Sequence, residues 1–417
     1  MKKPKKIINI SVAFLIISAL ILISMNAKSG ITQEIQNITS ENPKSVTAEK
    51  FSAKDPIDLP VNLLIKGMIS TNEIIATDKD SNKILLYNLT TKKQTTIIEP
   101  LNKGYYIKNV VSNSDWIVWV ENEVLIQDSS DKPFKWVIVA KNVKTGKVIT
   151  VDKSTLTNNK YNIPLFVNFT PDNLSLSKEN RVVYARNDLE NSQVISELIL
   201  YDLNTKISKT ISKSKEVSTE LIYLPNIYGD KVAWSLFRDL NDDTDRNKTF
   251  RNTQFKYSDI YIYDIKTDTT KQLTKDDFYH APSMFGDYMV AIHTPLNRDS
   301  YSEVVLFNLK TGDEKSIINE NSLIEKADIA KSIYRDHPVI NENFICWFNT
   351  GGFNNRFIFD YKNQKFIELY KNIDDDHQSI ITITGMLDNY VFMFLRSLNN
   401  NVRRNMYIKA NLYLDPT

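Results

Sequence analysis

One unit, repeated along the chain, constrains the fold of this sequence more than any other feature. It is clearest between Pro225 and Thr274, where a turn at Gly229 precedes an apolar segment that ends at Trp234. After a polar insert, Asp259–Asp264 alternates apolar and polar or aromatic residues with a period of two, which is typical of a half-buried strand. We therefore interpret the unit as four short antiparallel strands, a to d.

The second strand of the unit, strand b, recurs seven times. The fourth residue of its core, which we call the wedge position, recurs at steps of 43, 65, 50, 57, 56 and 46 residues. The seven wedge positions are Ala76, Trp119, Tyr184, Trp234, Ala291, Trp347 and Met393. Strand c gives an independent alignment, because five copies end in Asn or Asp with Thr three residues later. That Asn or Asp is expected to accept hydrogen bonds from its own turn.

Two signals in a fixed order at such a spacing indicate one supersecondary unit repeated along the chain. Four-stranded antiparallel units of this length are typical of β-propeller blades. The sequence thus predicts an all-β fold, a propeller of seven blades, with six blades and a capping hairpin as the alternative. Since one blade cannot bury both of its faces, the large residues Trp119, Tyr184, Trp234 and Trp347 are predicted to pack between neighbouring blades. Cys346 is predicted to pack in the core.

Residues 1–30 have the features of a targeting segment. Four lysines precede an apolar run from Ile7 to Met25, which predicts a hydrophobic helix that acts as a signal peptide or a signal anchor. We favour an anchor, because Met25 is bulky where a cleavage site prefers a small residue. The lysines would then stay in the cytoplasm and the remaining chain would lie outside, at a bacterial membrane or in secreted form.

The rest of the chain divides into a stalk at residues 31–59 and the propeller at residues 60–417. The stalk is polar and poor in aromatic residues, as flexible linkers are. The seventh unit lacks a full strand d before the chain ends, so we expect the segment Ser45–Leu59 to supply the closing strand. Because Cys346 is the only cysteine, a lipid-modified N-terminal cysteine and an internal disulfide are both excluded.

The units resemble the blades of TolB-like β-propellers, which run from a Pro and a Gly-Asp turn to a Val-Ala-Trp-like strand, an Asp-Ile-Tyr strand and a Leu-Thr ending. The best copies are Pro225–Thr274 and Pro282–Ile317, and weaker ones cover residues 60–412. The Ser-Pro-Asp-Gly turn of that group is absent here. The resemblance implies an envelope or periplasmic interaction module, although related propellers also serve as domains of peptidases and polysaccharide lyases.

Charge narrows the set of partners. Lys and Arg number 52 against 50 Asp and Glu, a balance that argues against a nucleic-acid partner. Arginine, however, first occurs at Arg181 and then falls mostly in or beside predicted b–c loops. The candidate ligand-binding residues are Arg186, Arg238, Arg298, Arg335, Arg356 and Arg396. Arginine suits carboxylates, sulfates and phosphates, so an acidic protein or an anionic polymer is the expected partner. The alternative is that these loops are solvated and pair with nearby acids such as Asp188 and Asp239.

Two metal sites can be proposed from the sequence, and neither has a fixed motif. Asp239, Asn241, Asp243 and Asp245 place oxygens at alternate positions, as a Ca²⁺ loop requires, although Thr244 replaces the glycine of an EF-hand loop. Alternatively this insert is simply solvated. His280, His293 and His337 precede or follow strands near one end of the predicted channel, where three imidazoles would suit a transition metal.

The function expected from the sequence is that of a membrane-anchored or secreted extracytoplasmic module that binds or scaffolds proteins or anionic polymers. No catalytic residue is predicted, and no Gly-x-Ser-x-Gly elbow occurs. The alternative is a metal-dependent lyase or hydrolase that processes polysaccharides with the histidine site. A sensory ectodomain is a third, weaker possibility.

Overall fold

The computed structural model divides the chain into two compact units, Met1–Thr47 and Ala48–Thr417, and the described residues belong to the second. They are residues 57–78, 82–123, 135–154, 171, 173–190, 193–214, 220–240, 255–275, 277–295, 302–318, 335–349, 357–368, 379–387, 390–397 and 403–409. The predicted N-terminal helix and most of the predicted stalk lie outside these residues. In the described part, no helix is long and apolar enough to cross a membrane.

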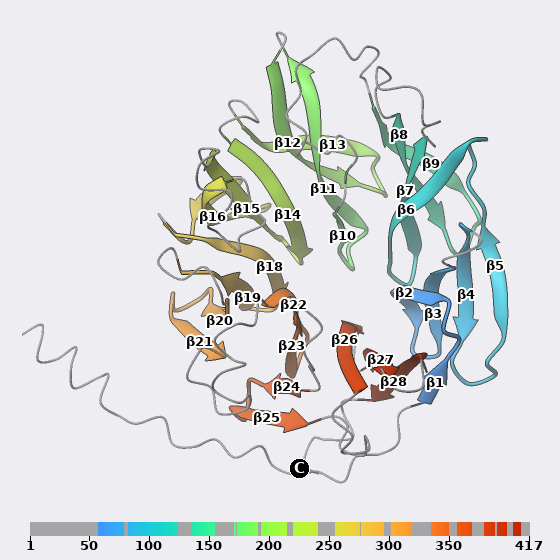
Figure 1. Ribbon diagram of the computed structural model, residues 1–417. Coiled ribbons are helices and arrows are strands. Elements are labelled where there is room, and N and C mark those ends of the chain that lie inside the picture. Colours follow the sequence, from blue (N-terminus) through green and yellow to red (C-terminus); the bar gives the residue numbers. More distant parts are fainter. Residues whose placement is uncertain are drawn as a thin grey trace, which may run out of the picture. The chain divides into compact units, whose positions relative to one another are not determined.

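Seven four-stranded antiparallel sheets make up this unit, and Figure 1 shows them around a common centre. In the order of strands a to d, blade 1 contains β2 (Leu63–Ser70), β3 (Glu73–Asp78), β4 (Ile84–Asn88) and β5 (Gln94–Ile98). Blade 2 contains β6 (Tyr105–Ser112), β7 (Trp116–Glu123), β8 (Trp136–Asn142) and β9 (Val148–Lys153). Blade 3 contains β10 (Leu174–Leu176), β11 (Arg181–Glu190), β12 (Gln193–Asp202) and β13 (Ile207–Lys213).

Blade 4 contains β14 (Glu220–Tyr228), β15 (Lys231–Leu240), β16 (Phe255–Asp264) and β17 (Thr269–Gln272). Blade 5 contains β18 (Tyr279–Phe285), β19 (Tyr288–His293), β20 (Glu303–Asn308) and β21 (Glu314–Ile318). Blade 6 contains β22 (Arg335–Ile340), β23 (Phe344–Asn349), β24 (Phe357–Asp360) and β25 (Lys365–Glu368). Blade 7 contains β26 (Ser379–Leu387), β27 (Tyr390–Ser397), β28 (Arg403–Lys409) and, as its strand d, β1 (Ile57–Leu59). The prediction of seven blades is confirmed.

The ring closes through chain segments that are far apart in sequence. β1 pairs antiparallel with β28, with Asp58 opposite Met406, so the first described strand completes the last blade. β2 of blade 1 contacts β26 of blade 7 directly. The expectation that a strand from the segment Ser45–Leu59 closes the ring is therefore confirmed. Closure removes the edge of β28 that would otherwise be open to pairing with another chain.

Large side chains at the wedge positions hold neighbouring blades together. Trp119, Tyr184, Trp234 and Trp347 are each at most 1% exposed. Each lies in a cluster with apolar residues of the preceding blade, as Trp119 does with Ile75 and Ile84. Cys346 is also buried, and burial raises the pKa of its thiol to about 12, so it stays an inert core residue. The predicted packing roles of these residues are confirmed.

In blade 5 a residue of strand a fills the space that a large wedge residue fills in other blades. The wedge position of this blade is Ala291, which leaves room that the larger residues occupy elsewhere. Tyr279 of β18 packs against the cluster that contains Ala291, Met289 and Phe307. Its ring lies 6.0 Å from that of Phe307, and its hydroxyl donates to Glu314 at 2.8 Å. A strand a residue thus replaces the missing strand b aromatic, which the strand b alignment alone does not reveal.

The innermost strands share an irregularity. Six of the seven strands a carry a register shift against strand b, and the residues on either side of it are Ile65/Gly67, Ile107/Val110, Tyr223/Asn226, His280/Ser283, Asp336/Val339 and Ile383/Gly385. Such bulges increase the local twist of a strand and redirect its side chains. The residues within the bulges therefore lie along the central channel of the ring.

Candidate functional site

The antiparallel order of the strands gives the ring two faces of different construction. The a–b and c–d turns lie on one face, which we call the c–d face. The b–c hairpins and the d–a connections between blades lie on the opposite face, which we call the b–c face. The sequence predicts the binding surface on the b–c face, and the contacts within the two faces differ.

Repeated hydrogen bonds fasten the turns of the c–d face. In six blades the residue that ends strand c accepts, on its side-chain oxygen, a bond of 2.8–3.2 Å from a turn N–H two or three residues later. These residues are Asn88, Asn142, Asp202, Asp264, Asn308 and Asp360. In each of these blades, the backbone N–H of the residue directly after the Asn or Asp donates to a carbonyl of the a–b turn at 2.8–3.3 Å. The predicted role of these Asn and Asp residues is confirmed.

Ion pairs between the turns reinforce the c–d face. Lys144 contacts Asp115 at 2.7 Å, and Lys266 contacts Asp230 at 2.6 Å, in each case between the c–d and a–b turns of one blade. The hydrogen bond from Lys144 lowers the pKa of Asp115, and those from Lys266 and Arg181 lower the pKa of Asp230. The polar groups of the c–d turns therefore bond those of the a–b turns on the same face.

Arg186, a predicted ligand-binding residue, lies instead within a polar cluster between blades 2 and 3. Its guanidinium donates to Glu197 at 2.8 and 3.0 Å and to Asp152 of β9 at 3.0 Å. Tyr184 donates its hydroxyl to the same Asp152 at 2.9 Å. Burial alone would lower the pKa of Arg186, but the bonds to Glu197 and the charge of Asp152 raise it. The geometry is that of a latch between blades.

Arg238 is likewise engaged by its own blade. It donates to Asp259, which is fully buried, with Nε 3.1 Å from Oδ2 and Nη2 bonded to the same oxygen. Its guanidinium also lies 5.7 Å from the centre of the Tyr257 ring. The acids that neutralise Arg186 and Arg238 are not the neighbours expected from sequence, because residues of β9, β12 and β16 supply them.

Of the other four candidate arginines, two lie on described strands. Arg335 begins β22 opposite Asn349, and Arg396 lies on β27 opposite Arg403. Arg298 and Arg356 lie outside the described residues. Of the predicted calcium loop, Asp239 is exposed at the end of β15, whereas Asn241, Asp243 and Asp245 also lie outside the described residues. Ligand binding by these residues stays a prediction.

The three histidines lie in different surroundings. His293 bonds Asp277 at 2.9 Å, lies 3.6 Å from Glu303 and stacks on Tyr279 with ring centres 4.3 Å apart. Burial lowers its pKa, but the bonds to Asp277 and Glu303 prevail and raise it to about 9. It is therefore a cation at neutral pH, which is unsuited to coordinating a metal.

The remaining two histidines do not join His293. Tyr279 pairs with His293 across the sheet, and His280 follows Tyr279, so His280 and His293 point to opposite faces of blade 5. His280 contacts the edge of Phe278, while His337 is exposed on β22 with a φ of 47°. No group of three His, Cys, Asp or Glu that could hold a metal ion occurs among the described residues.

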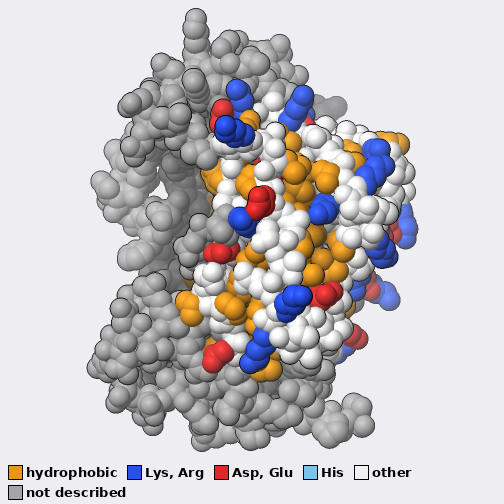
Figure 2. All heavy atoms as spheres, turned by 90° about the vertical axis from the view of Figure 1, so that its right-hand side faces the viewer, with side chains coloured by type: hydrophobic (Ala, Val, Ile, Leu, Met, Phe, Trp, Pro, Cys, Tyr) orange, Lys and Arg blue, Asp and Glu red, His pale blue; other side chains and the backbone are white. Residues whose placement is uncertain are grey.

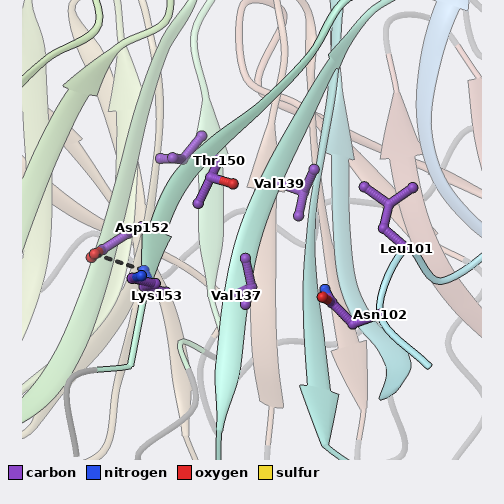
Figure 3. Close-up of a pocket in the computed structure, with 8 residues that line it drawn as sticks. Leu101, Asn102, Val137, Val139, Thr150, Asp152 and Lys153 are labelled. Carbon is purple, nitrogen blue, oxygen red and sulfur yellow. Dashed lines mark hydrogen bonds between the residues drawn. The ribbon is translucent and has the colours of Figure 1, made fainter. Parts of the chain in front are cut away.

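The b–c face carries a groove beside blade 2. Its volume is about 600 Å³, and it is lined by Leu101, Asn102, Val137, Val139, Thr150, Val151, Asp152 and Lys153. Figure 3 shows the apolar side chains of β8 between Leu101 and Asn102 at one end and Asp152 and Lys153 at the other. Asn102 is fixed there, because its side chain donates to Glu121 at 2.7 Å. No sequence motif indicates this groove.

Exposed apolar side chains accompany the groove. Val61, Leu64, Leu101 and Tyr106 are 37–56% exposed and lie in d–a connections or at the start of a strand a in blades 1 and 2. Ile57, Val148 and Ile207, which are 43–67% exposed, each begin a strand d on the c–d side of a different blade. Figure 2, which looks at the side of the ring occupied by β4 and β5, shows hydrophobic side chains reaching the surface among polar ones. Sequence patterns do not reveal this patch, because the residues of an innermost strand alternate between apolar and polar in the same way whether a blade or a ligand covers them.

Comparisons with known proteins place the chain by its fold alone. No family model matches it, and no curated protein does. Among solved structures, the β-propeller domain of the Trilobed protease from Pyrococcus furiosus, which has an open velcro topology, matches at 11% identity with a TM-score of 0.50. That match covers 87% of this chain and 99% of the other.

Two further structures share the propeller architecture. A prolyl endopeptidase matches at 10% identity and a TM-score of 0.52, over 85% of this chain and 49% of that protein, about half its length. TolB from Acinetobacter baumannii matches at 13% identity and a TM-score of 0.36, over 83% of this chain and 79% of TolB. The first two matches thus show that the chain shares the β-propeller architecture.

Proposed function

We propose that this protein is an extracytoplasmic binding module, held at the membrane by its N-terminal segment, whose b–c face engages a protein partner. The contrast between the two faces carries the proposal. The turns of the c–d face are fastened to one another by repeated hydrogen bonds and ion pairs. The b–c face instead presents a groove with the exposed apolar side chain of Leu101 in its lining, features that mark interaction surfaces.

The chemistry of this face favours a protein over an anionic polymer. Arg186 and Arg238, two of the candidates for polymer binding, are neutralised by acids of the propeller itself. Apolar side chains such as Leu101 and Tyr106 gain free energy only when a partner with apolar groups covers them. A metal-dependent enzyme has no support in this geometry, since His280 and His293 point apart.

Photo-cross-linking in cells tests the proposal. A photoreactive phenylalanine analogue placed at Leu101 should give a discrete cross-linked adduct with an envelope protein. The same analogue at Thr145, which is exposed in a c–d turn, is the matched control and should give none. Adducts from Thr145 alone, or the same adducts from both positions, would show that the b–c face is not the binding surface.

A further inference from the structure

Two neighbouring channel strands carry the same short pattern where they approach the b–c face. β2 reads Leu64-Ile65-Lys66 and β6 reads Tyr106-Ile107-Lys108. In both strands the Ile is the last residue paired before the bulge, and the Lys is the first residue within it. Relative to the wedge positions the two lysines are offset. Lys66 directly follows the residue that pairs with Ala76, whereas Lys108 lies two residues before the one that pairs with Trp119.

The two strands lie very close together. β2 contacts β6, and the hydroxyl of Ser112 donates to the carbonyl of Met68 at 3.3 Å. A Cβ on Gly67, the residue after Lys66, would lie 2.2 Å from the hydroxyl oxygen of Ser112. Only glycine permits this approach, which brings the bulge of β2 against the end of β6 at Ser112.

Lys66 has no counter-ion in the described part of the chain. Its side chain is half-buried, and burial lowers its pKa without any charged neighbour acting against that shift. Two other half-buried cations, Arg186 and Arg238, have carboxylate partners within 3.1 Å. A half-buried ammonium costs free energy, which an anion in the channel would offset.

The exposure of Leu64 and Tyr106 indicates what kind of molecule would carry the anion. They are 39% and 37% exposed and lie two residues before the lysines, nearer the b–c face. A free phosphate or a sugar acid would leave them uncovered, whereas a peptide brings a carboxylate and apolar side chains together. We propose that Lys66 binds a carboxylate of an acidic peptide segment whose apolar side chains cover Leu64 and Tyr106. This inference rests on the proposed function and names the class of its partner.

Fluorescence anisotropy with full-length protein in nonionic detergent tests the inference. The probe is a labelled peptide, Glu-Leu-Glu-Phe-Glu-Leu, and its counterpart carries Gln in place of Glu. The acidic peptide should bind saturably and the Gln peptide at least tenfold more weakly. Lys66→Gln should weaken binding about tenfold, equivalent to about 1.4 kcal/mol. Lys66→Arg should retain most of the affinity, and Lys93→Gln, on the c–d face, should change nothing.

A second measurement covers the case in which Lys66→Gln fails to fold. Acetylation of the unmodified protein, followed by mass spectrometry, should show that the acidic peptide protects Lys66 and leaves Lys93 unprotected. The inference is overturned by the absence of saturable binding, by equal binding of the Gln peptide, by unprotected Lys66, or by displacement of the peptide by inorganic phosphate alone. A cross-link from Leu101 combined with any of these results would leave the proposed function standing without this ligand.

Discussion

Single residues of the c–d turns adopt a backbone conformation that most side chains avoid. The fourth residue after the Asn or Asp that ends strand c has a φ between 54° and 83° in six blades, at Lys92, Gly146, Lys206, Asp268, Gly312 and Gln364. A type I turn followed by a left-handed residue is a common hairpin connection, and glycine is its preferred occupant. Two blades use glycine there and four use side chains, so four turns store strain.

Replacement of Lys206 by glycine should therefore stabilise the protein. The left-handed conformation costs a residue with a Cβ about 1–2 kcal/mol, part of which is offset by the greater freedom of glycine in the unfolded chain. We expect Lys206→Gly to raise the free energy of unfolding in urea by about 0.5–1 kcal/mol. Thr205→Gly, one residue earlier in the same turn, is the control and should lower it. A loss of stability in Lys206→Gly would contradict the assigned turn geometry.

His293 gives the protein a pH dependence of predictable sign. Its pKa rises from 6.5 to about 9 on folding, because the bonds to Asp277 and Glu303 outweigh burial. A group whose pKa is higher in the folded state stabilises fully below its unfolded pKa. The stabilisation should therefore be complete below about pH 6.5, fall as the pH rises, and vanish above about pH 9, a difference of about 3 kcal/mol.

The measurement is the free energy of unfolding of the protein minus that of His293→Gln between pH 6 and pH 10. The difference should decline with rising pH, and Asp277→Asn should flatten the decline because it removes the closer acid. An NMR titration of the His293 ring should give a midpoint near 9. A midpoint near the ordinary value would show that the two carboxylates do not act on the ring.

Adjacent blades are joined by polar latches as well as by the wedge residues. The residue two positions after the wedge position points towards the preceding blade or its connection, as Glu121, Arg186 and His293 do. Glu121 accepts bonds from the backbone of Leu101 and Asn102, and His293 bonds Asp277. The sequence alignment contains this position, but residues as different as Glu, Arg and His conceal the common role.

Loss of the Arg186 latch should destabilise the propeller. Arg186→Gln leaves the carboxylates of Asp152 and Glu197 largely buried without their closest cation, since Lys213 lies 3.9 Å from Glu197. We expect a loss of about 2–3 kcal/mol in thermal or urea unfolding, below the value for a fully buried pair because the cluster is partly solvated. The double variant Arg186→Gln, Glu197→Gln should recover part of it, since one uncompensated charge is removed.

Arg181 provides the matched control from the same strand. It contacts Asp230 at 2.9 Å on the c–d face, where both side chains are more exposed than the Arg186 cluster. Arg181→Gln should therefore cost at most about 1 kcal/mol. Equal losses in the two variants would mean that Arg186 is an ordinary surface residue and would return it to the set of candidate ligand-binding residues.

At the scale of the whole molecule, the sequence predicts the fold better than the site. Repeats at a fixed spacing follow from the packing needs of every blade, so strands b and c and the large wedge residues could be read from the chain. The position of the binding surface, by contrast, cannot be derived from the repeat. Asp152, one partner of Arg186, lies on the preceding blade, which only the folded ring brings near, and the exposure of Leu64 likewise depends on its surroundings in the folded ring.

Closure of the ring fixes which connections share a face, so the functional proposals depend on it. Asp58 lies opposite Met406 in the pairing of β1 with β28, across almost the whole chain. In antiparallel strands the Cβ atoms of opposed residues are about 4.5–5.5 Å apart, within the range that a disulfide can bridge after a small adjustment. The buried Cys346 should not interfere.

Oxidation of the double variant Asp58→Cys, Met406→Cys tests closure most directly. The account predicts an intramolecular disulfide, seen as a faster-migrating monomer on a non-reducing gel. The variant Asp58→Cys, Lys409→Cys, in which the second cysteine lies three residues farther along β28, should form far less of it. Absence of the intramolecular disulfide in the first variant, or equal yields in both, would contradict a ring closed by the N-terminal strand.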